Sequence, residues 1–338
     1  MARHDPLGQD DEWIQGHPPR FFGYNARMTI DQSPPSIGRR WVTAARPWAF
    51  PASTMPVIFG TSLAVVAGGA SLNILLFGGA FAAMVILHAA ANMLSDVFDF
   101  RHGLDTQPTP VSGAIVRGWL TERQVARGAG VLFAAGIALG LVLAWRTSWI
   151  LLAIGAAGVL IGAAYTLLKA RALGDAAVFL NFGVLGALGA WIVQTGRFSW
   201  LPVAWSVPIA MLVSGILHAN NWRDIATDSG RRIRTCAGIL GDRGSLVYYG
   251  FLLFGSQLLV IAFAGLPLVF PGPPRLPWPC LLTLAVLPEA AALWRRARRR
   301  RRPKNPLDFV VLDGATARYN LHFGLLYTAG LWLGRWLG

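Results

Sequence analysis

The sequence predicts an all-α protein built as a multi-pass transmembrane bundle of about nine helices around a central cavity. Of the 338 residues, 54% are hydrophobic and only 14% are charged, and the mean hydropathy is +0.48. These values do not describe a soluble protein. From Pro47 to Ser95 the chain carries no Asp, Glu, Lys or Arg, whereas about 20 apolar residues in a helix suffice to cross a bilayer core.

Uncharged stretches of this kind recur along the chain, and each predicts one or two spanning helices. Glycine is frequent, with 38 residues, as expected where helices pack closely within lipid. The eighth predicted span is the least regular, because it contains Glu289 and three prolines. The predicted spans are 48–69, 73–95, 125–145, 148–168, 174–194, 200–221, 246–270, 277–295 and 317–337.

The placement of the positive charge predicts how the bundle lies in the membrane. The net charge is +14, and with nine spans and an inner N-terminus, 26 of the 30 Lys and Arg residues fall on one side. The outer segments hold only Arg146, Arg197, Arg275 and Arg335. This asymmetry is typical of a cell-membrane protein whose N-terminus and long basic loops are cytoplasmic. It indicates anionic membrane lipid, and no nucleic acid, as the partner of the basic segments, including the run that starts at Arg295.

The chain divides into a tail and a membrane domain. Residues 1–40 are polar, contain four prolines and lack a secretory signal, so they predict a disordered cytoplasmic tail, within which Met28 is a second candidate start. Residues 41–338 form the transmembrane domain. The two cysteines, Cys236 and Cys280, are expected to form neither a disulfide nor a metal–thiolate site.

The first cluster of chemically useful side chains follows the second span. Asn92, Asp96 and Asp99 are spaced at i, i+4 and i+7, so that a helix places their oxygen atoms on one face. Asp105 follows in the same loop, 96–124. The sequence therefore predicts a carboxylate-rich surface at the mouth of the cavity.

A second cluster follows the sixth span with similar geometry. Asn221, Asp224 and Asp228 are spaced at i, i+3 and i+7 at the start of the loop 222–245. In both places an apolar helix ends in Asn, Asp and Asp and then enters a basic loop, which indicates a weak internal repeat.

Clustered carboxylates repel one another unless a cation lies among them, and Mg²⁺ (or Mn²⁺) is commonly held by carboxylates together with substrate phosphates. The pattern therefore predicts a metal-bridged diphosphate, whose neutralisation makes it a good leaving group from an allylic carbon. Two alternatives stay open. The acids are also compatible with solvated loop residues, or with a divalent-cation carrier, for which Glu289 is the one acid in mid-span.

Basic side chains in three inner loops are candidates to bind the diphosphate. Lys169 follows Tyr165 by one helical turn, and Arg223 adjoins Asp224. His88 and His218 lie close to Asn92 and Asn221, where they fit either a cavity lining or helix packing, and His322 is expected to serve packing. The other basic candidates are Arg117, Arg231, Arg232 and Arg234.

The motifs resemble those of the UbiA superfamily of intramembrane prenyltransferases, which carry one Asn/Asp-rich motif in each of two cytoplasmic loops. The resemblance covers roughly 40–338 and is strongest to the 1,4-dihydroxy-2-naphthoate polyprenyltransferases of menaquinone synthesis. The chain departs from that subfamily at Ser95, at His88 and in the loop after Asp228. The shared segments are Arg46-Pro-Trp, Asp99-Phe-Arg-His-Gly-Leu-Asp105, Leu173-Gly-Asp175, Asn181-Phe-Gly183, Val193-Gln-Thr-Gly196, Asn220-Asn-Trp-Arg-Asp224, Asp228, Thr235, Leu240-Gly241 and Asp313-Gly-Ala-Thr-Ala317.

The resemblance implies transfer of a polyprenyl chain from its diphosphate to an aromatic acceptor, with loss of CO₂ if the acceptor is 1,4-dihydroxy-2-naphthoate. The alternative acceptors are 4-hydroxybenzoate, homogentisate, a haem or a glycerol phosphate ether. The expected catalytic residues are Asp96, Asp99, Asp224 and Asp228, which with Asp105 are also the expected metal ligands. The expected substrate-binding residues are Asn92, Asn221, Lys169, Arg223, Arg117, Arg234 and Tyr165.

Overall fold

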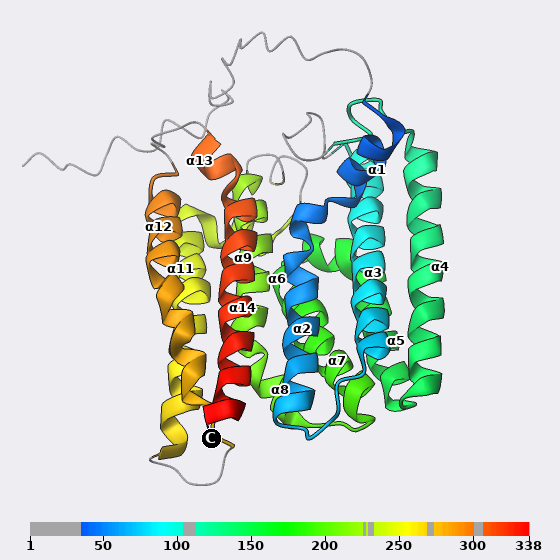
Figure 1. The fold of residues 1–338 in the computed structure, drawn as a ribbon. Helices are drawn as coiled ribbons and strands as arrows, with labels where there is room; N and C mark the ends of the chain where they lie inside the picture. The colour runs from blue at the N-terminus through cyan, green and yellow to red at the C-terminus, as the bar shows by residue number, and fades with distance from the viewer. Residues whose placement is uncertain are drawn as a thin grey trace, which may run out of the picture. The chain divides into compact units, whose positions relative to one another are not determined.

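A computed structural model describes residues 35–103, 113–225, 228, 233–268, 274–300 and 307–337 of the chain. The compact unit Ile37–Gly338 contains the helices, and within its described residues the only β-type pairing is an isolated bridge between Arg171 and Arg234. The predicted all-α class is confirmed. Figure 1 shows helices of this unit running up and down beside one another.

The first half of the unit forms four passes. The chain enters through α1 (Ile37–Ala45) and the short η2 (Pro47–Ala49) and then bends by 56° into the first pass. Helix α1 thus begins inside the segment expected to be a tail. The four passes are α2 (Pro51–Val66), α3 (Ile74–Arg101), α4 (Glu122–Arg146) and α5 (Ile150–Ala170).

The second half forms five further passes, three of which are built from more than one helical piece. The fifth joins α6 (Gly174–Val178), the π-helix η3 (Phe179–Leu185) and α7 (Gly186–Thr195). The sixth joins α8 (Trp200–Trp205) and α9 (Val207–Arg223), and the seventh is α11 (Cys236–Gly265), followed by η4 (Leu266–Leu268). The eighth joins η5 (Trp278–Val286) and α12 (Leu287–Arg298), and after α13 (Leu307–Val310) the ninth is α14 (Leu312–Leu337).

Five of these described segments are by themselves long and apolar enough to cross a membrane, and the bent pair at the N-terminal end of the unit makes a sixth. The others fall short for local reasons. The sixth pass breaks at Ser206, the eighth begins as a 3₁₀ helix, and the ninth carries Asn320 and His322 in its middle.

Side-chain caps fix where several passes begin. Asn73 accepts a hydrogen bond from Leu76 N, and Thr121 forms a capping box with Gln124 at the start of α4. Thr235 caps α11, which therefore begins ten residues before the predicted residue 246. A kink at Gly241 separates this early part from the rest of α11, because Gly241 takes a non-helical φ of +61° and ψ of −172°, a conformation that strongly favours glycine.

The two sides of the bundle differ in how they are packed. Helices α2, α7, α9, α11 and α14 surround one buried core that includes Phe59, Tyr249 and Tyr327. In contrast, α5 buries none of its residues, and apolar side chains such as Leu160 and Val131 are mostly exposed. An apolar surface of this extent requires lipid rather than water around it, so the chain is an integral membrane protein.

Candidate functional site

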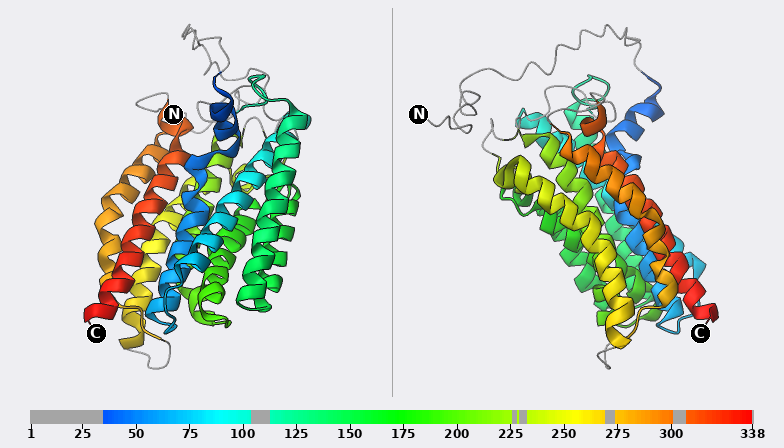
Figure 2. Two further views of the ribbon diagram at one scale, coloured as in Figure 1. Left: turned by 45° about the vertical axis from the view of Figure 1, so that its right-hand side comes forward. Right: turned by 90° about the vertical axis from the view of Figure 1, so that its left-hand side faces the viewer.

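Both aspartate motifs lie at the same end of the bundle. The first lies on the last turns of α3 and the second follows the end of α9, and both helices finish at the end where α1 lies (Figures 1 and 2). A backbone hydrogen bond of 3.2 Å from Arg234 N to Ala170 O joins the loop after α9 to the end of α5. The loop after the sixth pass therefore meets the end of the fourth pass.

In the first motif the carboxylates are buried on α3. Asp96 is 3% exposed and pairs with the guanidinium of Arg46. Arg46 holds this position with a left-handed backbone, at φ 56° and ψ 59°. Asn92 donates a hydrogen bond of 3.0 Å to Ala45 O, and Asp99 is buried one turn further on. Asn92 and Arg46 thus tie the motif to the entry segment of the first pass.

In the second motif an arginine again neutralises the first aspartate. Arg223 donates through Nε and Nη2 to the two carboxylate oxygens of Asp224, at 2.9 and 3.0 Å. Its Nη1 donates to Asp313 Oδ2 at 2.9 Å. Arg223 is therefore held between two carboxylates, and its predicted binding of the diphosphate stays a prediction.

Lys169 lies where the two motifs face each other. The carboxylates of Asp99, Asp224 and Asp228 all act electrostatically on its ammonium group, and Asp99 and Asp228 are buried. Lys169 forms no hydrogen bond or ion pair with the residues that the structure describes. Tyr165, one turn earlier, lies in the field of Lys169 and Asp99. The ammonium group therefore lies close to both motifs and is available to a ligand.

Asp175, at the start of α6, is a polar centre beside the second motif, and the spacing of the two aspartate motifs does not predict it. His218 Nδ1 lies 2.9 Å from Asp175 Oδ2, and Ser214 Oγ donates to Asp175 O at 2.8 Å. Asn221 Nδ2 points to Asp175 Oδ1 at 3.5 Å. The sequence marks Asp175 only through the segment Leu173-Gly-Asp175, because its partners are more than 35 residues away.

Several other candidate residues have different surroundings. Arg117 stacks on Trp119 with 4.9 Å to the ring centroid, and the side chain of Arg234 is exposed. His88 contacts Ser53 Oγ at 2.8 Å, and His322 pairs with Glu289 at 2.8 Å. Glu289 therefore has a side-chain partner within the described structure. The same contact joins His322 to Glu289, which agrees with the packing role predicted for His322. Asp105, Arg231 and Arg232 lie outside the described residues.

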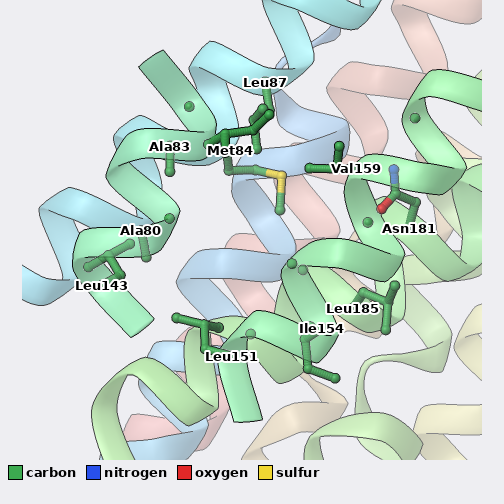
Figure 3. A pocket seen from close by; sticks show the side chains of 18 of the residues that line it. Ala80, Ala83, Met84, Leu87, Leu143, Leu151, Ile154, Val159, Asn181 and Leu185 are labelled. Atoms are coloured by element: carbon green, nitrogen blue, oxygen red, sulfur yellow. The ribbon is translucent and has the colours of Figure 1, made fainter. Parts of the chain in front are cut away.

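An apolar cavity of about 440 Å³ lies deeper in the bundle, among α2, α3, α4, α5, η3 and α7. Its lining is apolar, including the thioether of Met84, except for Asn181, whose amide is seen among the lining side chains in Figure 3. Asn181 lies on the π-helix, a rare geometry that is common at functional sites. The cavity can accept a hydrocarbon chain, and α4 and α5 on its lining expose apolar side chains outward.

The donor set at the motifs fits a hard divalent cation. Its donors are carboxylate and amide oxygens, which Mg²⁺ prefers. Asp99 Oδ1 is buried and has no hydrogen-bond partner among the described residues. A buried carboxylate oxygen without a partner is costly, and a cation would satisfy it.

Comparison with known proteins identifies the family. The UbiA prenyltransferase family profile matches residues 53–334. UbiA prenyltransferase domain-containing protein 1 of Danio rerio is 34% identical over 311 residues, which cover 90% of this chain and 87% of that protein.

Two solved structures share the fold. A UbiA homolog from Aeropyrum pernix K1 has a TM-score of 0.57 at 18% identity, covering 84% of this chain and 97% of that one. A UbiA homolog from Archaeoglobus fulgidus, described as bound to DMAPP and Mg²⁺, has a TM-score of 0.52 at 13% identity over 84% of this chain and 98% of that one. The profile match spans most of the chain, which therefore belongs to the UbiA prenyltransferase family and is a membrane prenyltransferase.

Proposed function

We propose that the chain ionises an allylic prenyl diphosphate at the meeting point of its two aspartate motifs and transfers the prenyl group to an electron-rich acceptor. The observation that carries this proposal is the position of Lys169, on which Asp99 of one motif and Asp224 and Asp228 of the other act together. A single polyanionic group can bridge a lysine and metal-bound carboxylates, and a diphosphate has the required charge.

The residues divide the work by their charge and partners. Asp96, Asp99, Asp224 and Asp228, assisted by Asn92, Asn221 and Asp105, would hold Mg²⁺, which stabilises the negative charge of the leaving diphosphate. Lys169 binds the diphosphate directly. Arg46 and Arg223 hold Asp96 and Asp224 in place, so they act as positioning residues.

The apolar cavity is the proposed place of the prenyl chain. Its walls on α3, α4 and α5 are nearly free of polar side chains, so a hydrocarbon tail gains free energy by leaving water or the lipid headgroups. Ionisation breaks the C–O bond to the diphosphate, and the allylic cation is then attacked by a carbon or oxygen atom of the acceptor, which loses a proton or CO₂. Substrate and product are both soluble in lipid, which suits an enzyme whose cavity walls lie within the bilayer.

We propose that the acceptor is one of the alternative acceptors and not the 1,4-dihydroxy-2-naphthoate of menaquinone synthesis. The name of the relative from Danio rerio gives the family domain and no acceptor. Ser95 and His88 depart from the sequence pattern of the dihydroxynaphthoate enzymes. We infer an acceptor other than 1,4-dihydroxy-2-naphthoate, with 4-hydroxybenzoate, homogentisate, haem and a glycerol phosphate ether as candidates. The charge asymmetry further supports a cytoplasmic position for both motifs.

Product analysis tests this proposal. Purified protein in lipid nanodiscs is given Mg²⁺, a prenyl diphosphate and one acceptor at a time, with 1,4-dihydroxy-2-naphthoate included, and products are identified by mass spectrometry. We expect one of the alternative acceptors to gain the mass of the prenyl group. Exclusive prenylation of 1,4-dihydroxy-2-naphthoate would contradict the inferred acceptor, and no diphosphate release with any acceptor, together with Mg²⁺ flux, would favour the carrier alternative.

A further inference from the structure

We propose that Asp175, His218 and Cys236 form a second metal site, for a Zn²⁺-class ion, separate from the Mg²⁺ site at the aspartate motifs. This proposal revises the expectation from the sequence that Cys236 takes part in no metal–thiolate site, because the fold brings two further ligands to it. The three residues come from α6, α9 and α11, and one potential ligand atom of each lies within 4.8 Å of the others. Asp175 and His218 are buried, and Cys236 is a half-buried free thiol.

The donor atoms determine which ion the site would select. A thiolate, an imidazole nitrogen and a carboxylate oxygen form a mixed donor set that suits Zn²⁺ and excludes Mg²⁺, which takes oxygen ligands. Zn–N and Zn–S bonds of about 2.1 and 2.3 Å place the ligands of one ion roughly 3 to 4 Å apart. The three side chains are therefore close enough for small rotations to complete the site.

The burial and orientation of His218 support a ligand at this position. His218 is fully buried, and its Nδ1 lies 2.9 Å from Asp175 Oδ2. Nδ1 is therefore the ring nitrogen that would bind the ion together with Asp175, and Nε2 would be the nitrogen that metal-ligating histidines donate to water or another outer partner. Asn221 Nδ2 is directed at Asp175 and would help to orient its carboxylate.

A simple hydrogen-bond cluster around Asp175 is the alternative to a bound ion. It explains the contacts of His218 Nδ1, Asn221 Nδ2 and the Cys236 thiol with Asp175. A bound cation accounts for the same convergence of a carboxylate, an imidazole and a thiol, and only the cation makes Cys236 a metal-bound thiolate.

The position of the site gives the ion a structural role. It would connect the starts of α6 and α11 to α9 next to Asn221, and so fix the backbone that carries the second aspartate motif. Because only the folded chain brings these three ligands together, Zn²⁺ should raise the melting temperature in a concentration-dependent manner.

Cobalt substitution tests the site with a readout that does not depend on activity. The full-length protein, freed of any polyhistidine tag and stripped with a chelator, is titrated with Co²⁺ in detergent without Mg²⁺ or prenyl diphosphate. We expect one equivalent to bind and to give the near-ultraviolet charge-transfer absorption of a cobalt thiolate. Cys236→Ser and His218→Gln should lose this absorption, whereas the matched control Cys280→Ser should keep it, since Cys280 is buried elsewhere beside Tyr327.

Two results of this titration would overturn the proposal. Absence of saturable Co²⁺ binding, or a thiolate band that persists in Cys236→Ser, would rule the site out. If Cys236→Ser does not fold, wild-type protein is alkylated with and without Zn²⁺ and the modified cysteine is found by peptide mass spectrometry. Protection of Cys236 supports the site, and equal modification rates contradict it. Because no prenyl substrate is present, these results are independent of the proposed transferase function.

Discussion

At the scale of single residues, Lys169 is the side chain on which the proposed site depends most. It is the cation on which carboxylates of both motifs act. We expect Lys169→Ala to raise the KM for the prenyl diphosphate by about 10-fold, equal to about 1.4 kcal/mol, with a smaller change in kcat. This follows because the lysine contacts the diphosphate both before and during ionisation. Steady-state kinetics at saturating acceptor measure both constants.

The matched control is Arg171→Ala, an exposed cation two residues away at the end of the same helix. It should leave the KM within about 2-fold of wild type, because exposed charges interact weakly. A Lys169→Ala enzyme with unchanged KM would show that the ammonium does not bind the diphosphate.

The aspartates were predictable as residues, but their partners were not. The helical spacing of Asn92, Asp96 and Asp99 is local, so the sequence alone places them on one face. The pairing of Asp96 with Arg46, and of Arg223 with Asp313, joins residues 50 and 90 positions apart. Such contacts depend on how helices pack, and spacing along the chain carries no signal for them.

At the scale of helices, the packing of α2 on α7 depends on a glycine. A Cβ atom added at Gly60 would lie 2.1 Å from the backbone oxygen of Ala187, and backbone cannot move aside as a flexible side chain can. We expect Gly60→Ala to destabilise the fold by about 1 to 3 kcal/mol. Thermal unfolding in detergent should show this as a melting temperature several degrees lower.

Gly130→Ala on α4 is the control for this change, since nothing lies within 4 Å of a Cβ atom there. Alanine is also the better helix former, so this variant should be at least as stable as wild type. Equal melting temperatures for both variants would contradict the close approach of α2 and α7.

The positions of the helices were more predictable than their interruptions. Apolar runs of about 20 residues indicate spans directly, and all nine predicted spans overlap helical segments of the described chain. The π-helix at Phe179–Leu185 and the break at Ser206 have no such signal. They arise where one helix must fit against its neighbours, and hydropathy does not report that fit.

At the scale of the whole helical unit, tryptophans mark the end opposite the aspartate motifs. Trp145 and Trp149 flank the turn between α4 and α5, and Trp200, Trp278 and Trp336 lie at the matching ends of their passes, all of them 60 to 75% exposed. Exposed tryptophans at one level are typical of a membrane interface. Together with the charge asymmetry, they predict that this end faces outward.

Cysteine labelling in a background without Cys236 and Cys280 tests this orientation. A cysteine replacing exposed Gly118, near the first motif, should react only with reagents that reach the cytoplasm. A cysteine replacing Phe198, which is 42% exposed at the other end, should react from outside. Labelling of the Gly118 position by an impermeant reagent in intact cells would invert the proposed topology.

The measurement that tests the central claim most directly is Mg²⁺-dependent diphosphate release by Asp99→Asn, Asp228→Asn and the double variant. If both carboxylates serve one metal–diphosphate site, each single change should lower kcat by about 10²-fold, equal to roughly 2.7 kcal/mol of transition-state stabilisation. The double variant should lose little more, because the first change already disables the shared site. The control Glu122→Gln, in an exposed ion pair with Arg101, should keep normal turnover. Near-normal kcat in both single variants, or losses that multiply in the double variant, would contradict a single site built from the two motifs.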